Sequence, residues 1–492
     1  MLGSRPLSVP DEGRYVEIPR EMVATGDWLT PRLNEVKYFE KPPLFYWFEA
    51  GLIKLFGLGE WSVRLGPALF ALFGCLAVYY AGTRLFGCRT GLLSAVVLAT
   101  SLLYYSMGRA ITLDMPVSVL LTAALLSFLI GTREPAGTAR RLLFWGFFAF
   151  AALAVLTKGL IGIVIPGMVI FAWMLITNEW RVLQSIHLLS GTAIFLAIAA
   201  PWHILVQRVN PEFFDFYFIH EHLERYLTKI HGRYKPAWYF IPILIAGLLP
   251  WSAFLIQSIG HALPRSWRDR RGNSAQIFLV LWASIVFLFF SASSSKLIPY
   301  IMPVLPPLAL LIGNYLAGVW ERNDTLGLRA GYVLLIILSL LFAGGLMVLP
   351  HYRSEIDLHG LRPHLFTLSG ILVASALLTV VRYGRSEFRK VFTALTVCMV
   401  LFLTVTNTVM SHVDTRSVKQ LALELKPRLL PGDEVSAYKT YYQDLPVYLE
   451  RRITVVDWTG ELVFGTTVED TKGWMINEAE FWKRWEGPGR VY

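Results

Sequence analysis

Long apolar segments are the feature of this sequence that most constrains its fold. A helix needs about 20 mainly apolar residues to cross a hydrocarbon layer roughly 30 Å thick, and about twelve stretches approach or reach that length. Lipid offers a backbone no hydrogen-bond partners, so such stretches span as helices. The sequence therefore predicts an all-α polytopic membrane protein, with spans near 62–86, 91–108, 115–131, 142–157, 160–177, 186–206, 237–258, 276–292, 297–318, 329–349, 365–382 and 391–409.

The composition agrees with a membrane protein. Hydrophobic residues make up 55% of the chain and charged residues only 16%, and the mean hydropathy is +0.50. These values are too apolar for a soluble chain of this length. The net charge of +10 then indicates basic cytoplasmic loops rather than nucleic-acid binding. The three cysteines have the spacing of neither a zinc site nor a disulfide framework.

The loops between the spans alternate in charge. Arginines recur in one set of loops, for example in RSWRDRR (265–271) and RYGRSEFRK (382–390). The positive-inside rule places that set in the cytoplasm. The other set is then extracytoplasmic, and it comprises residues 1–61, 109–114, Lys158, 207–236, 291–296, 351–364 and the C-terminal tail.

The chain divides into a membrane domain and a small tail domain. The membrane domain covers residues 1–410, with large extracytoplasmic loops at 1–61 and 207–236, and it starts with a polar stretch that has no signal peptide. We therefore expect a first transmembrane helix upstream of this stretch. The tail, 411–492, predicts a small extracytoplasmic α/β domain with a helix at 415–430 and strands at 434–440 and 452–458. We expect it to pack or to act as a lid, without catalytic residues of its own.

Polar side chains gather on the extracytoplasmic side. Singly, each has an ordinary explanation: carboxylates near a helix start, lysines that snorkel from a span end, or loop histidines. A helical bundle does not need so many polar side chains on one side for stability, and burying unpaired charges would destabilise it. Their gathering therefore indicates a functional site. The residues are Asp11, Glu12, Arg14, Tyr15, Tyr38, Glu40, Lys41, Arg109, Asp114, Lys158, His220, Glu221, His222, Glu224, Arg225, Lys296 and Tyr300.

The chemistry of these groups suits a phosphorylated lipid. The carboxylates can supply a general base or metal ligands, and Glu40 with His220 offers an oxygen and nitrogen pair suited to Zn²⁺ or Mn²⁺. Cationic side chains bind phosphate, and a phosphate at the rim of apolar helices indicates a lipid. The cations are Lys41, Lys158, Arg225 and Lys296. We expect Pro42 and Pro43 to end a preceding helix.

Several blocks resemble one known family. DEGRYVEIPREM, GDWLTPRLNEVKYFEKPPLFYW, RAITLDMP, TKGLIG, HEHLERYL and SSKLIPYIMPVLPPLAL occur in this order along nearly the whole chain. They resemble the polyprenyl-phosphate-sugar-dependent glycosyltransferases of the C-type membrane fold, most of all the lipid A aminoarabinose transferases, which are related to protein O-mannosyltransferases. The EKPP and HEHLER blocks together are specific, whereas each alone is weak.

The resemblance implies a role for each matching residue. Asp11 is implied as the leading catalytic carboxylate, with Asp114 and Lys158 nearby in the cavity. Lys41 and Arg225 are implied to bind the phosphate of undecaprenyl phosphate, and Glu40 and His220 to hold a divalent metal, Zn²⁺. The remaining substrate-binding residues of the cavity are Arg14, Tyr15, Tyr38, Lys296 and Tyr300.

The implied function is an inverting transfer of a sugar from undecaprenyl phosphate to an extracytoplasmic acceptor at a bacterial inner membrane. Transfer of 4-amino-4-deoxy-L-arabinose to lipid A, which confers polymyxin resistance, is the first expectation. The same chemistry with another sugar, onto protein, glycan or lipid, stays open. A transporter or flippase of lipid-linked sugars is the alternative of another class, although such proteins usually show repeated halves and polar residues near the midplane. The sequence leaves the oligomeric state open.

Overall fold

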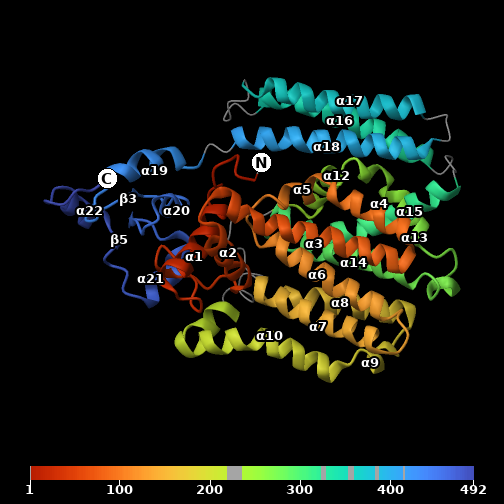
Figure 1. Cartoon of the computed structure of the whole chain (residues 1–492), viewed down its shortest axis with the longest axis horizontal. Helices are drawn as coiled ribbons and strands as arrows, with labels where there is room; N and C mark the ends of the chain where they lie inside the picture. The colour runs from red at the N-terminus through yellow and green to blue at the C-terminus, as the bar shows by residue number, and fades with distance from the viewer. Residues whose placement is uncertain (1, 219–234, 323–327, 353–359, 383–386, 414–415) are drawn as a thin grey trace.

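The computed structural model describes residues 2–218, 235–322, 328–352, 360–382, 387–413 and 416–492. Long helices run side by side along the length of the molecule, and a small domain of short helices and strands caps one end (Figure 1). This arrangement confirms the all-α membrane bundle with a small C-terminal α/β region.

Nine helical segments in the described part of the chain are long and apolar enough to cross a membrane. This bears out most of the expected spans. The helices are α3 (Glu60–Phe86), α6 (Asp114–Gly131), α7 (Thr138–Lys158), α10 (Leu188–Val209), α14 (Ser274–Ala292), α15 (Leu305–Arg322) with the 3-10 turn before it (Ile298–Val304), α16 (Arg329–Tyr352), α17 (Arg362–Arg382) and α18 (Phe388–Val413).

The three other expected spans are helical but shorter or broken. Segment 160–177 is α8 (Ile161–Thr177), and 91–108 is divided into α4 (Cys88–Ala99) and α5 (Leu102–Met107). At that break, the hydroxyls of Thr100 and Ser101 each donate a hydrogen bond to the backbone carbonyl four residues earlier. Such contacts tend to bend helices.

Segment 237–258 is bent by 108° between Ala237–Gly247 and Trp251–Ala262. The first part contains α12 (Phe240–Gly247), and the second contains α13 (Leu255–Ala262). Pro250 lies between them and has no N–H for a continuous helical ladder. The pair counts as one further span only if both parts belong to a single crossing.

The ends of the bundle separate the two sets of loops as the charge pattern predicted. The starts of α3 and α6 and the ends of α7, α10, α14 and α18 lie toward the end that carries the small domain (Figure 1). The arginine-rich connection at residues 265–271 lies toward the other end, where α9 (Val182–Ser185) is found. The α6 helix and the segment Ile298–Glu321 are the most deeply buried spans, so they form the centre of the bundle.

The first 60 residues fold over one end of the bundle. They form α1 (Asp11–Thr25), a hairpin of β1 (Arg32–Leu33) and β2 (Val36–Lys37), and α2 (Leu44–Phe56). Asn34 and Glu35 both have positive φ, as a two-residue hairpin turn requires. The expectation for the two prolines was wrong: no helix precedes them, and Pro43 is instead the residue immediately before α2. Proline is tolerated at the start of a helix because the N–H groups there have no partner within the helix.

The tail forms the predicted small α/β unit. The expected helix is α19 (Lys419–Leu425), and the expected strands are β3 (Ser436–Tyr438) and β4 (Thr454–Val456). A third strand, β5 (Met475–Ile476), completes a parallel sheet in the order β3-β4-β5. The helices α20 (Leu445–Leu449) and α21 (Val463–Val468) connect the strands, and α22 (Glu478–Trp485) follows the last strand.

The tail and the N-terminal region share one hydrophobic core. Ile18 and Met22 of α1 and Tyr46 of α2 pack with Val455 and Leu462 of the tail. The side chain of Asn34 also exchanges two hydrogen bonds of 3.0 Å with the backbone of Ile453. The tail is therefore fixed onto α1 and α2 rather than tethered loosely to the bundle.

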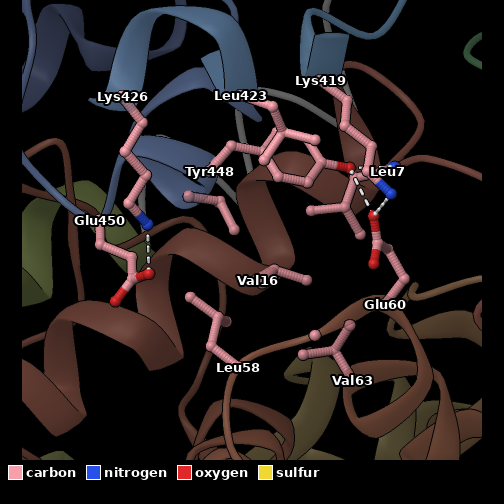
Figure 2. A pocket seen from close by; sticks show the side chains of 12 residues that line it. Leu7, Val16, Leu58, Glu60, Val63, Lys419, Leu423, Lys426, Tyr448 and Glu450 are labelled. Atoms are coloured by element: carbon pink, nitrogen blue, oxygen red, sulfur yellow. Dashed lines mark hydrogen bonds and ion pairs between the residues drawn. The ribbon is translucent and has the colours of Figure 1, made fainter. Parts of the chain in front are cut away.

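A second seam joins the tail to the start of α3. Figure 2 shows the pocket along this seam, where Lys419 forms an ion pair of 2.5 Å with Glu60. The Tyr448 hydroxyl donates to Glu60 and accepts a 2.8 Å hydrogen bond from the Leu7 backbone. Lys426 pairs with Glu450 across the same pocket. Its polar groups thus pair with one another, which identifies a structural seam.

Candidate active site

Arg14 is the centre of the polar cluster at the capped end of the bundle. It lies on the second turn of α1, where its buried guanidinium forms an ion pair of 3.6 Å with Asp11 one turn earlier. It also donates a 3.4 Å hydrogen bond to the Tyr38 hydroxyl and lies over the Tyr15 ring. The Nε atom of Arg14 is buried and makes no hydrogen bond, so it is a donor still available to a substrate.

The C-terminal tail supplies a residue of this cluster that the sequence analysis did not identify. Glu461 forms a 2.8 Å ion pair with Arg14 and accepts a 2.9 Å hydrogen bond from Gln443. The sequence analysis expected a tail without catalytic residues, whereas the structure places this tail carboxylate against Arg14; a role for it in the site stays a prediction. Glu461 lies far from α1 in the sequence, in the short 3-10 turn Gly460–Leu462. Nothing in the neighbouring sequence distinguishes this carboxylate from one that is exposed to solvent, so sequence analysis had no signal for it.

Tyr15 lies where the predicted carboxylates converge. Burial raises the pKa of the Tyr15 hydroxyl, Arg14 opposes that rise, and the charges of Asp11, Asp114 and Glu40 add to it. Charges from three segments of the sequence thus act on one hydroxyl, and burial keeps that hydroxyl a neutral hydrogen-bond donor. The ring of Tyr46 on α2 stacks 6.2 Å from the Tyr15 ring.

Tyr46 is the other residue that the sequence analysis missed. Its hydroxyl is buried and makes no hydrogen bond in the described structure. Burial raises its pKa, so it too is a neutral donor. Its position in the apolar run LFYWF conceals this role, because an aromatic residue in such a run usually belongs to the core.

The EKPP block lies at the edge of the Arg14 cluster. Burial raises the pKa of Tyr38, and the charges of Glu40 and Glu461 raise it further while Arg14 opposes them. The Glu40 side chain therefore acts on the same group of residues as Glu461. Next to it, the partly buried Lys41 donates a 2.6 Å hydrogen bond from Nζ to the backbone carbonyl of Glu40.

Asp114 and Lys158 form an ion pair beside this cluster. Asp114 is the first residue of α6, and Lys158 is the last residue of α7. Each side chain has the sign that its helix end favours, and the two ends meet because α6 and α7 are antiparallel neighbours (Figure 1). The Lys158 ammonium lies 4.6 Å from the centre of the Tyr300 ring, so all three predicted residues come together.

Lys296 lies near Tyr300 in the sequence but turns to the backbone. Its buried ammonium donates a 2.9 Å hydrogen bond to the carbonyl of Lys235 and another to the carbonyl of Ser293. Burial lowers its pKa. These contacts close the start of the 3-10 turn against the segment that follows residue 234.

Two of the predicted site residues, His220 and Arg225, lie outside the described residues, as do Glu221, His222 and Glu224. Of the predicted metal ligands Glu40 and His220, the described structure therefore contains only Glu40. Among the described residues, no group of three or more His, Cys, Asp and Glu side chains is placed to hold a metal ion.

The assembled residues combine cations with carboxylates at one rim of an apolar bundle. Arg14, Lys41 and Lys158 are partly or fully buried, where their charges are less screened than at a free surface. Such cations can stabilise a phosphate on which charge develops. Asp11 is the most exposed of the carboxylates, with a side chain 56% exposed, so it can reach a polar acceptor.

Two protein families match parts of the chain. Residues 40–205 match the family described as dolichyl-phosphate-mannose-protein mannosyltransferase. Residues 421–491 match the aminoarabinose transferase C-terminal domain. The first match covers the EKPP block and the helices that carry Asp114 and Lys158, and the second covers Gln443 and Glu461.

Whole-chain similarity extends these matches. The chain is 31% identical to the undecaprenyl phosphate-alpha-4-amino-4-deoxy-L-arabinose arabinosyl transferase of Erwinia tasmaniensis, over 98% of this chain and 87% of that protein. Among solved structures, ArnT from Cupriavidus metallidurans bound to undecaprenyl phosphate is 32% identical with a TM-score of 0.86, over 98% of this chain and 88% of that one.

A more distant structure shares the architecture. The Archaeoglobus fulgidus oligosaccharyltransferase in its apo form has a TM-score of 0.51 at 13% identity, over 91% of this chain and 60% of that one. At this identity the likeness is one of fold alone.

Proposed function

Because the chain belongs to the family of undecaprenyl phosphate-alpha-4-amino-4-deoxy-L-arabinose arabinosyl transferases and is a multi-pass membrane glycosyltransferase, we propose that it transfers 4-amino-4-deoxy-L-arabinose from undecaprenyl phosphate to lipid A. The observation that carries this proposal is the position of Glu461. This residue of the aminoarabinose transferase C-terminal domain faces Arg14 inside the polar cluster.

The charge of the donor sugar supports the choice of substrate. The amino group of 4-amino-4-deoxy-L-arabinose is a cation at neutral pH, whereas mannose is neutral. Asp11, Glu40 and Glu461 surround Arg14 and Tyr15, and their charges act on the same hydroxyls. Such a set of carboxylates attracts a cationic sugar and offers no comparable gain to a neutral one.

The leaving group is the lipid phosphate. Negative charge develops on it as the bond to the anomeric carbon breaks, and fixed cations stabilise that charge without rearranging. We assign this role to Lys41 and to Arg225, with Lys158 nearby. Asp114 holds Lys158 in place through their ion pair, so it acts as a positioning residue in this scheme.

The nucleophile is an oxygen of the acceptor. A lipid A phosphate is already anionic at neutral pH, so orienting it matters more than removing a proton. We assign this step to Asp11, whose exposed carboxylate can accept a proton or fix an acceptor hydroxyl through a hydrogen bond. One direct displacement on the face opposite to the phosphate inverts the anomeric centre.

A divalent metal, Zn²⁺, at Glu40 and His220 is a separate proposal. A metal held there would add positive charge near the leaving phosphate. Glu40 has the oxygen ligand that Zn²⁺ accepts, and it lies beside the assigned phosphate-binding lysine. No step above depends on the metal. Metal content of the purified protein and of a His220→Ala variant, measured by mass spectrometry, tests it.

We further propose a location in a bacterial inner membrane, with the site facing the periplasm. The arginine-rich connections lie at the end of the bundle opposite to the Arg14 cluster, and the positive-inside rule assigns that end to the cytoplasm. The donor lipid then reaches the site from the outer leaflet.

A complementation experiment tests the proposed function. The gene is expressed in a strain that lacks its own transferase, and lipid A is analysed by mass spectrometry together with polymyxin resistance. We expect the wild type to restore both, and Lys41→Ala to abolish both. Lys54→Ala is the matched control, since Lys54 is an exposed lysine of α2 that lies over the Trp28 ring. Unmodified lipid A with the wild type would overturn the proposal.

A second experiment separates the enzyme from its alternatives. Purified protein in detergent is given undecaprenyl-phosphate aminoarabinose or a polyprenyl-phosphate mannose with lipid A. Turnover with the amino sugar excludes a transporter, because detergent leaves no second compartment. Faster turnover with mannose would favour the related mannosyltransferase chemistry instead.

A further inference from the structure

A basic pocket lies at the end of the bundle opposite to the Arg14 cluster. It has a volume of about 420 Å³ and is formed where the connection from α6 to α7, the start of α7, the end of α8, α9 and the start of α14 meet. Four arginines line it, together with one carboxylate and several small polar residues: Arg133, Arg140, Arg181, Arg271, Glu179, Thr132, Ser185 and Ser274. This set is called the basic pocket below.

The arginines of the basic pocket are not used in ion pairs. None of them has a carboxylate within ion-pairing distance in the described part of the chain, although other arginines of the same end do, such as Arg84 with Glu134. The Nε atom of Arg140 is buried and makes no hydrogen bond. A buried donor without a partner is costly unless a ligand or water completes it.

Neighbouring contacts hold the pocket open. Arg133 donates a 3.0 Å hydrogen bond to the Ser274 hydroxyl, and the Trp173 ring nitrogen donates one of 2.9 Å to the Ser274 carbonyl. These bonds tie the end of α8 and the loop after α6 to the start of α14. The walls of the pocket are therefore joined by residues from the loop after α6, from α8 and from the first turn of α14.

Membrane topology alone does not explain this geometry. The positive-inside rule requires arginines in the loops of this end, but it sets no requirement that they line one hollow. Arg265 and Arg268 satisfy the rule from outside the pocket, in the same loop as Arg271. The four pocket arginines repel one another around a single carboxylate, and an anion bound among them relieves that repulsion.

The surface beside the pocket is apolar and faces outward from the bundle. Phe171 and Leu175 of α8 are 56% and 60% exposed, and Leu183 of α9 is 48% exposed. Trp180, next to two pocket residues, is 40% exposed, and tryptophan favours the interface between lipid and water. An anionic group bound here would thus have a lipid-facing surface directly beside it.

We propose that the basic pocket binds the phosphodiester headgroup of an anionic phospholipid, whose acyl chains lie along α8. Its volume is in the range of small-ligand sites, and basic pockets between spans on the inner side of membranes bind such headgroups. The site is separate from the transferase site and does not depend on the proposed function.

Lipid binding to the purified full-length protein tests this proposal. Native mass spectrometry follows the binding of phosphatidylglycerol and of zwitterionic phosphatidylcholine. We expect preference for phosphatidylglycerol, about fivefold weaker binding in Arg140→Gln, and about 25-fold weaker binding when Arg181→Gln is added, following the usual effect of one cation near anionic lipid. Arg268→Gln, which removes the same charge outside the pocket, should bind like the wild type.

Two further measurements keep the test decisive. Glu179→Gln removes the one carboxylate that lines the pocket, so it should strengthen the binding of phosphatidylglycerol, a gain that misfolding cannot produce. Inorganic phosphate alone should fail to displace the lipid. The proposal is overturned if both phospholipids bind equally, if the double variant binds like Arg268→Gln, or if inorganic phosphate displaces the lipid and thereby identifies a site for a free anion.

Discussion

Glu12 lies at the centre of a buried ion cluster that should hold the N-terminal segment in place. Its carboxylate is 2% exposed. It accepts two hydrogen bonds from Arg5 and two from Arg64, at 2.7–3.2 Å, and two more from the backbone amides of Ser8 and Ile111. The cluster thereby joins the segment before α1 to α3 and to the loop that leads into α6.

We predict that Glu12→Gln opens this segment. Glutamine keeps one acceptor oxygen but turns an NH₂ group toward donors, and it leaves the Arg64 charge buried without its counter-charge. Breaking a buried ion pair from one side costs about 3–5 kcal/mol. A cost of about 3 kcal/mol corresponds to a roughly 100-fold larger open population.

Limited chymotrypsin digestion measures that population. Leu7 is buried in the closed segment and is followed by Ser8, so cleavage after Leu7, detected by mass spectrometry, tracks the open fraction when opening is fast relative to cleavage. We expect at least about a 100-fold faster cut in Glu12→Gln. Glu450→Gln, which breaks the exposed ion pair to Lys426, should change it less than about fivefold. Equal rates in the two variants would refute the argument that this cluster stabilises the segment.

Three more predictions follow from the same structure. Lys158→Met and Asp114→Asn should each lower the initial rate of the purified enzyme about 100-fold, through loss of a fixed charge or of its holder; unchanged rates would contradict their assignment. Glu461→Gln should lower kcat/KM for the amino-sugar donor and spare a neutral one. Burial raises the pKa of Glu461, so this carboxylate takes up a proton at a higher pH than an ordinary glutamate. As the pH decreases, kcat/KM should therefore begin to fall above the usual pKa of glutamate, and Glu461→Gln should not show this fall. Burial alone would raise the pKa of Glu12, but Arg64, Arg5 and Ser8 hold it below the ordinary value. The stability that Glu12 contributes is therefore complete above its unfolded pKa and is lost as the pH falls through its lower folded pKa. The melting temperature of the wild type should fall in that pH range, and that of Glu12→Gln should not.

The resemblance seen in the sequence, to polyprenyl-phosphate-sugar transferases of the aminoarabinose type, is confirmed by the relatives described above. The predicted roles of the individual site residues stay predictions. The structure brings Asp11, Arg14, Tyr15, Tyr38, Glu40, Asp114, Lys158 and Tyr300 to one end of the bundle. That grouping was predictable because each of them lies in a loop or at a span end that the charge pattern placed on the same side of the membrane.

The spans themselves were predictable because hydrophobicity is a local property. Any stretch of about 20 apolar residues must leave water, whatever the rest of the chain does. The breaks within spans were harder to foresee, since the bend at Pro250 depends on which neighbours can accept it. The mean hydropathy of 237–258 does not distinguish a straight crossing from a bent one.

The sequence by itself determined the membrane class, the two sets of loops and the end of the bundle that carries the site. Tertiary structure alone decided which charges meet. Glu461 reaches Arg14 only because the tail shares a core with α1 and α2, and four arginines line one pocket only because the ends of α6 and α8 meet the starts of α7 and α14. The physical reason is range: burial of apolar segments depends on neighbours along the chain, whereas the partner of a charge depends on distances in space.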